Sequence, residues 1–271
     1  RLTVDDKKHS MKIVLDGKKA LVGGSSGGIG KAIAQQLASS GASVTLMARN
    51  EDKLKSVLES LSTSEGQSHQ YLVVDFSDYE AYKKVISEFF KSNSVDILVN
   101  NTQGPSAGNA LEKNVEDYQN AFDLLFKTVV LTTELALPHM LQEQWGRVIN
   151  VASISVKEPL SYLALSNSIR ASLVTWAKSL ATDVGDKQIT VNSILTGYFD
   201  TERIAQLNAK KAEQLGISEG EVLADMKSKV PLKRIGDPKE YGYLVAFLAS
   251  DNAAFITGTQ IPIDGGLLKS L

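Results

Sequence analysis

A run of glycines near the start of the chain has the composition and spacing of a phosphate-binding loop. Residues 23–30 have the sequence GGSSGGIG and join an apolar run to an amphipathic stretch. Glycine lets the backbone turn sharply and approach a pyrophosphate, and the N-terminus of the following helix meets the negative charge. This strand–loop–helix context supports dinucleotide binding, and the alternative is a glycine-rich turn without a ligand. The residues expected to contact the dinucleotide are Gly24, Ser26, Gly28, Ile29 and Gly30.

The end of the second apolar run bears on which dinucleotide is bound. A protein that binds NAD usually places a carboxylate there to hold the ribose hydroxyls. This chain has Ala48 at that position, and Arg49 follows directly. A guanidinium can pair with a 2′-phosphate, so Arg49 favours NADP(H) over NAD(H). The alternative is a solvated arginine at the end of a strand.

Composition excludes several other kinds of chemistry. The 271 residues include no cysteine, which rules out disulfides, a catalytic thiol and a cysteine-ligated metal. The three histidines, His9, His69 and His139, have no metal-ligand spacing, so we expect no metal site. A net charge of −2 gives no sign of a nucleic-acid or membrane partner. We expect no apolar run of the roughly 20 residues that a membrane span needs, and the composition fits a cytoplasmic protein.

Short apolar runs alternate with longer amphipathic stretches. This alternation predicts a doubly wound α/β fold, in which helices cover both faces of a parallel sheet. The expected strands are Lys19–Gly23, Ser43–Ala48, Tyr71–Asp75, Ile97–Asn100, Arg147–Ala152, Thr190–Leu195 and Gln260–Asp264. The expected helices are Gly28–Ser40, Glu51–Leu61, Tyr79–Ser92, Val115–Gln144, Leu165–Val184 and Pro238–Ala249. We predict a single Rossmann-like domain over residues 11–271 with about seven strands, and we expect residues 1–10 to be a polar arm ahead of a natural start at Met11.

One segment interrupts the alternation. Asp200–Lys229 is charged and helical in pattern, and it lies between the sixth and seventh expected strands. It therefore begins at the carboxyl end of a strand, where open α/β sheets bind their ligands. We expect a helical lid over residues 200–229 with Gly216 and Gly220 as hinges, and the alternative is a solvated helical hairpin.

Several motifs resemble those of the short-chain dehydrogenase/reductase family, and the resemblance covers nearly all of residues 15–266. The glycine loop matches the family's TGxxxGxG pattern, with Gly23 in place of the threonine. VNNTQG at residues 99–104 is similar to the family's NNAG stretch with one extra residue. The motifs that resemble the β-ketoacyl-carrier-protein reductase branch are Arg234–Pro238, Phe247–Asp251, Thr257–Gly258 and Asp264–Gly266. The resemblance implies a homodimer or homotetramer, and further cofactor contacts from Asp75, Asn101 and Thr201.

The resemblance also implies an active site between residues 151 and 173, with altered residues. In the family a serine binds the substrate oxygen, a tyrosine supplies the proton, and a lysine lowers the tyrosine pKa and holds the nicotinamide ribose. Ser153 matches the serine, but Ser166 stands at the tyrosine position and Arg170 at the lysine position. Serine does not ionise at physiological pH and arginine cannot act as a base, although Arg170 can still bind the ribose. The family's relay asparagine aligns with Leu125.

Three functions are compatible with these residues. The first is an NADP(H)-dependent oxidoreductase that acts on a small-molecule carbonyl or alcohol, with Ser153 as a donor to the substrate oxygen or as a structural serine. Its proton would come from bulk water or from Tyr162, four residues before Ser166, unless Tyr162 is a packed aromatic. Loss of acid–base help costs about 10²–10⁴ in rate, which alone does not prevent hydride transfer. The second is an inactive dinucleotide-binding sensor or partner subunit, and the third is a structural subunit without cofactor, against which the glycine loop argues.

Overall fold

Seven parallel strands form one sheet in the computed structural model, which describes residues 12–270. The strand order is β3-β2-β1-β4-β5-β6-β7. The winding of the chain reverses between β1 and β4, and the carboxyl ends of these strands border the crevice where such sheets bind ligands. The predicted fold class is therefore confirmed. The predicted arm over residues 1–10 lies outside the described residues.

The strands form because near-continuous apolar runs can be buried on both faces of a parallel sheet. β4 is buried throughout, and β5 and β6 are buried except at their last residues. The bounds of the strands are β1 Lys19–Gly23, β2 Ser43–Ala48, β3 Gln70–Val73, β4 Ile97–Asn100, β5 Gly146–Ser153, β6 Ile189–Thr196 and β7 Gln260–Ile263.

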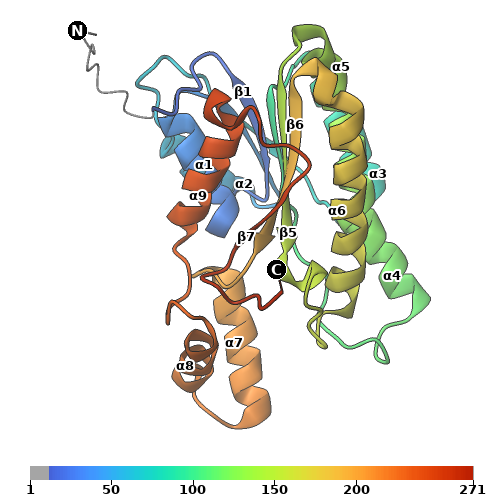
Figure 1. Cartoon of the computed structure of the whole chain (residues 1–271), viewed down its shortest axis with the longest axis vertical. Helices are drawn as coiled ribbons and strands as arrows, with labels where there is room; N and C mark the ends of the chain where they lie inside the picture. The colour runs from blue at the N-terminus through green and yellow to red at the C-terminus, as the bar shows by residue number, and fades with distance from the viewer. Residues whose placement is uncertain (1–11, 271) are drawn as a thin grey trace, which may run out of the picture.

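Helices cover both faces of the sheet (Figure 1). One layer consists of α1 (Gly28–Ser39), α2 (Glu51–Glu59) and α9 (Pro238–Ala249), and the other contains α3 (Tyr79–Phe90) and α6 (Ala164–Val184). α1 and α9 pack closely, because a Cβ on Gly242 of α9 would lie 2.8 Å from the carbonyl oxygen of Ala32 of α1. Each layer encloses its own apolar core against the sheet.

The predicted helix over residues 115–144 is divided into α4 (Val115–Phe122), the π-helical segment η1 (Asp123–Lys127) and α5 (Thr128–Glu143). Leu125, which aligns with the relay asparagine, is buried in the apolar core within η1. By length and composition alone, Val115–Glu143 could cross a membrane, although charged residues interrupt its apolar stretch. Core helices share these properties, and 44% of its most apolar window is buried in this fold.

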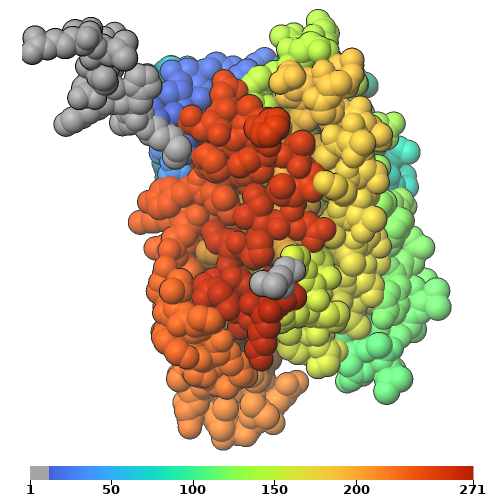
Figure 2. Space-filling view, in the orientation of Figure 1, coloured from blue at the N-terminus to red at the C-terminus, as the bar shows by residue number. Residues whose placement is uncertain are grey.

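Two helices form the predicted helical segment after β6. α7 (Glu202–Leu215) and α8 (Glu219–Lys229) make a hairpin that projects from the body of the molecule, next to the C-terminal segment (Figures 1 and 2). Asp225 of α8 pairs with Lys211 of α7 at 3.6 Å. Gly216 ends α7 with a left-handed φ of +66°, whereas Gly220 lies inside the first turn of α8 and does not separate the helices.

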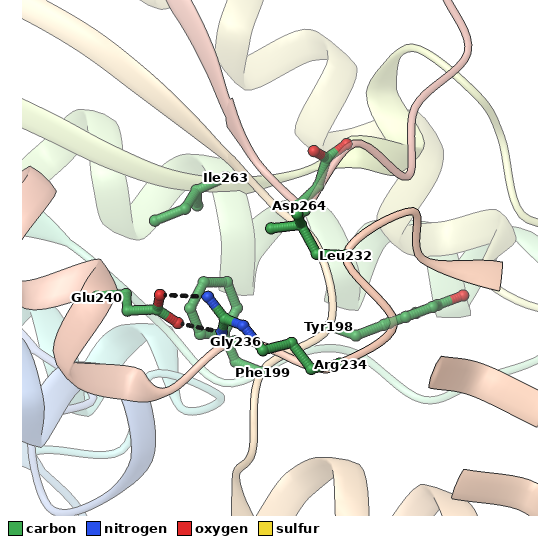
Figure 3. Close-up of a pocket in the computed structure, with 9 residues that line it drawn as sticks. Tyr198, Phe199, Leu232, Arg234, Gly236, Glu240, Ile263 and Asp264 are labelled. Atoms are coloured by element: carbon green, nitrogen blue, oxygen red, sulfur yellow. Dashed lines mark hydrogen bonds and ion pairs between the residues drawn. The ribbon is translucent and has the colours of Figure 1, made fainter. Parts of the chain in front are cut away.

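An ion pair fixes the loop that joins this hairpin to α9. Two nitrogens of the Arg234 guanidinium each lie 2.7 Å from an oxygen of Glu240 (Figure 3). Hydrogen bonds from Arg234, assisted by the N–H of Asp237, lower the pKa of Glu240 to about 2. The pair borders a small pocket of about 170 Å³ that Tyr198 and Phe199 also line. The RxGxP motif therefore has a structural explanation in this chain.

Candidate active site

The glycine-rich loop crosses the carboxyl end of β1 and leads into α1. Gly24 has a left-handed φ of +56°, and a Cβ on Gly30 would collide with the carbonyl oxygen of Gly24. Only glycine meets both constraints without strain. Buried Ser25 ties the loop to β2, because its hydroxyl accepts the N–H of Met47 at 2.9 Å. No side chain in residues 12–270 caps the first turn of α1, whose N–H groups can therefore bind a phosphate.

A cleft of about 630 Å³ opens beside this loop. It extends from Arg49, after β2, to Thr196 and Gly197 at the end of β6. Eight of the ten residues predicted to bind the cofactor line it: Gly24, Ser26, Gly28, Ile29, Gly30, Arg49, Asn101 and Thr201. The side-chain amide of Asn101 also donates to the carbonyl of Gly23 at 3.0 Å, which joins β4 to the loop. Asp75 and Arg170 do not line this cleft.

We had expected Asp75 to close the third strand, but it lies beyond the end of β3. β2 ends at Ala48, opposite Val73, so no strand partner remains for Asp75. One oxygen of Asp75 accepts two hydrogen bonds from Ser77, and the other lies 3.9 Å from the Arg49 guanidinium. Burial raises the pKa of Asp75, but these bonds and the Arg49 charge outweigh burial and lower it. The neighbouring Phe76 lines the cleft instead.

Three charged side chains that we did not predict also line the cleft. Lys53 of α2 and Glu202 of α7 form an ion pair at 3.1 Å, and the Arg203 guanidinium donates to the carbonyl of Pro105 at 3.4 Å. These contacts hold the start of α7 beside the cleft, with the Thr201 methyl 3.2 Å from where a Cβ on Gly28 would lie. The one signal available in the sequence was proximity to predicted cofactor contacts. Lys53 follows Arg49 by four positions, and Glu202 and Arg203 directly follow Thr201.

Ser153 ends β5 and lies opposite Thr196 of β6 in the sheet. Its hydroxyl oxygen accepts the N–H of Ser155 at 3.1 Å, which caps a short 3₁₀ helix over Ile154–Val156. The Ser153 hydroxyl proton is not used in this bond, and Ser153 is not among the residues that line the cleft. The Ser155 hydroxyl is buried and has no hydrogen-bond partner within residues 12–270.

Ser166 and Arg170 lie one turn apart on α6, and both are buried. The Arg170 guanidinium donates to the carbonyl of Val151 at 2.5 Å, two residues before Ser153. The ion pairs of the described chain provide it with no carboxylate. Burial lowers the pKa of Arg170 to about 10, partly opposed by Tyr241. The bond to Val151 is the one hydrogen bond that its guanidinium makes within residues 12–270.

Tyr162 lies in the loop that enters α6, since the helix begins at Ala164. Its backbone carbonyl accepts the N–H of Gly108 at 2.8 Å, and the side chain is about half exposed. Burial, and then the neighbouring Tyr198, raise the pKa of the Tyr162 hydroxyl above its ordinary value. Tyr162 is not among the residues that line the cleft, and its raised pKa makes the hydroxyl a weaker acid than an ordinary tyrosine. Residues 12–270 bring together no group of three or more His, Asp or Glu side chains that could hold a metal.

Comparisons with known proteins agree with this geometry. A family model described as enoyl-(acyl carrier protein) reductase matches residues 24–268. The oxidoreductase UcpA of Salmonella typhimurium is 35% identical over 263 residues, covering 93% of this chain and 95% of UcpA. The 3-oxoacyl-(acyl-carrier-protein) reductase FabG of Rickettsia conorii is 33% identical, covering 94% and 99%. The L-sorbose reductase of Gluconobacter frateurii, solved with NADPH and L-sorbose, is 32% identical with a TM-score of 0.89, covering 96% and 100%.

Proposed function

Because this chain belongs to the short-chain dehydrogenase/reductase family, we propose that it is an NADP(H)-dependent oxidoreductase that interconverts a carbonyl and an alcohol through an altered proton path. The observation that carries the proposal is the cleft beside the glycine loop, which is lined by the uncapped N-terminus of α1 and by Arg49. That arrangement fits a dinucleotide with a 2′-phosphate.

The residues present fit NADP(H) along the length of the cleft. The uncapped first turn of α1 suits the pyrophosphate, and the Arg49 guanidinium suits the 2′-phosphate. The preceding residue is Ala48, where an NAD-binding protein usually has a carboxylate. We assign Asn101 and Thr201 to the nicotinamide half and Asp75 to the adenine end, in line with the family. NADPH bound to the related sorbose reductase supports this choice of cofactor.

The chain's own residues would divide the carbonyl chemistry as follows. NADPH supplies a hydride to the carbonyl carbon, and a separate proton must reach the carbonyl oxygen to form the alcohol. Ser153 would donate a hydrogen bond to that oxygen from the end of β5. Arg170 would hold the ribose and stabilise negative charge through the donors that Val151 does not use. Ser166 would not supply the proton, because its hydroxyl does not ionise in this pH range.

Tyr162 or bulk water would supply the proton. Tyr162 has the exposure and the loop position to reach a bound substrate, but its raised pKa makes it a slow donor. Steady-state NADPH oxidation by Tyr162→Phe separates the two sources. A rate unchanged from wild type assigns the proton to water, whereas a loss of about 10²-fold assigns it to Tyr162.

A dinucleotide-binding protein without catalysis is the second candidate. Leu125, buried in the core within η1, cannot hold a relay water, and Ser166 and Arg170 replace the tyrosine and lysine. A titration with NADPH, paired with a panel of ketones and diketones, distinguishes the candidates. Binding with turnover supports the oxidoreductase, and binding without turnover supports the sensor or partner subunit. In the second case Ser166→Tyr combined with Arg170→Lys is expected to create activity.

We also propose that the protein forms a homodimer or homotetramer in the cytoplasm. Several apolar side chains of α4, η1, α5 and α6 pack against the core but are only partly buried. They include Phe122, Phe126, Trp176 and Leu180. Phe122 and Phe126 stack with ring centroids 4.9 Å apart, and Phe126 meets Trp176 edge-on. A second subunit would cover this apolar face. Sedimentation equilibrium tests the assembly, and a monomer at micromolar concentration would contradict it.

A further inference from the structure

Lys53 connects two parts of the molecule that are far apart in the sequence. It lines the cleft together with Arg49, and Glu202, the first residue of α7, lines the same cleft. The Lys53 ammonium lies 3.1 Å from a carboxylate oxygen of Glu202, although 149 positions separate the two residues. This ion pair therefore joins the 2′-phosphate end of the cleft to the start of the helical hairpin.

The stability of α2 does not explain the position of Lys53. The N-terminus of a helix carries partial positive charge, so a cation in the first turn is disfavoured. Lys55, two residues further along α2, has a carboxylate of its own helix at 2.9 Å, that of Glu51. Lys53 instead pairs with a carboxylate of another helix, that of Glu202 on α7. Its placement is better explained by an anion that binds in the cleft.

The pair between Lys53 and Glu202 is weak enough to be exchanged. The two side chains are 53% and 70% exposed, and exposed ion pairs contribute little because water screens them. A phosphate monoester carries a charge of about −1.5 to −2 at pH 7 and three strong acceptor oxygens. It is therefore a stronger partner for an ammonium than a single exposed carboxylate. Arg49, which lines the same end of the cleft, would hold such a phosphate within reach of Lys53.

We propose that Lys53 is shared between Glu202 and the 2′-phosphate of the cofactor, so that NADP(H) takes Lys53 from Glu202 and NAD(H) does not. This rests on the proposed function, in which NADP(H) binds in this cleft. Lys53 is then a residue that determines cofactor specificity. The exchange also frees the first residue of α7, next to the Thr201 contact with the glycine loop. The start of the hairpin thereby responds to the presence of the 2′-phosphate.

Calorimetric titration of the full chain with NADPH and with NADH tests the exchange. Lys53→Met is expected to weaken NADPH binding about tenfold and to change NADH binding less than twofold. Glu202→Gln removes the competitor, so it should tighten NADPH binding about twofold to fivefold. The same substitution in a Lys53→Met background should have no effect. Lys55→Met, of similar exposure on the same helix, is the matched control and should change neither affinity.

Three results would overturn the exchange while leaving the proposed function intact. In the first, Lys53→Met weakens NADPH and NADH binding equally, and in the second it affects neither. In the third, Glu202→Gln has the same effect with Lys53 present as in the Lys53→Met background. A wild-type protein that binds neither dinucleotide would overturn the proposed function and the exchange together. Parallel titration with adenosine 2′,5′-bisphosphate and adenosine 5′-monophosphate isolates the phosphate, and Lys53→Met should weaken only the first.

Discussion

Replacement of Arg170 by methionine is expected to stabilise the protein and, at the same time, to weaken its binding of NADPH. Arg170 is buried on α6 with no carboxylate partner in the described chain, and burial lowers its pKa from 12.5 to about 10. Each pKa unit corresponds to about 1.36 kcal/mol, so keeping this group charged in the folded state costs about 3 kcal/mol at pH 7. Methionine has a similar length and removes that cost.

Part of this gain is offset, because the carbonyl of Val151 loses the hydrogen bond from Arg170. An unsatisfied carbonyl costs about 1–3 kcal/mol. We therefore expect a net increase of up to about 2 kcal/mol in the free energy of unfolding and a rise of up to a few degrees in Tm. The folded-state pKa is depressed, so the charge penalty is fully present below about pH 10 and disappears as pH rises towards 12.5. The stability advantage of the variant over the wild type should accordingly shrink as pH rises above 10.

The same substitution removes the donors that we assign to the nicotinamide ribose. Hydrogen bonds to a charged group contribute about 1.5–3 kcal/mol, so NADPH affinity should fall about tenfold to a hundredfold. Urea denaturation and calorimetric titration measure the two effects on one preparation. Arg147→Met is the matched control, because Arg147 is also buried but binds the carbonyl of Gln188 and the carboxylate of Asp251. It should lose stability and retain NADPH affinity. If Arg170→Met behaves in this same way, Arg170 is a structural residue and our assignment is wrong.

Three further substitutions test other parts of the site and fold. Ser153→Ala should lower kcat/KM for carbonyl reduction about 10²-fold without changing NADPH affinity, and an unchanged kcat/KM would make Ser153 structural. Gly30→Ala should abolish NADPH binding in a titration, because its Cβ collides with the carbonyl of Gly24, and retained affinity would show that the loop is not the binding site. Glu240→Gln should cost about 1 kcal/mol at pH 7, since its ion pair with Arg234 is half-exposed. The depressed Glu240 pKa means that this difference is lost as pH falls through about 2, and urea denaturation across pH that showed no such loss would contradict it.

Much of the fold was predictable because its signals are local. A central parallel strand is a short apolar run, and the bounds of β1, β2 and β4 agree with those predicted. The end of β3 was not predictable, because it depends on where β2 stops. The division of the helix over residues 115–143 also escaped prediction, since apolar periodicity does not distinguish a π-helical segment from the α-helix around it.

The candidate site divides in the same way. The glycine loop and Arg49 were predictable because strand, turn and helix N-terminus follow one another directly along the chain. The contact between Lys53 and Glu202 was not, because it depends on where the fold places the start of α7 relative to α2. The isolation of Arg170 was equally invisible, since a sequence shows that an arginine is present but not that no carboxylate reaches it.

The two replacements on α6 are best understood as one change. A lysine is needed at this position while a phenol must be activated, because a compact ammonium can lower the phenol pKa. Ser166 has no phenol to activate, so the remaining task is to hold cofactor oxygens, for which the five donors of Arg170 serve well. The same argument implies that Ser166→Tyr alone gains little, because the new phenol lies near a guanidinium directed at Val151. Arg170→Lys alone provides a suitable cation but no acid. Activity should therefore rise far more in the double variant than the sum of the single variants would give.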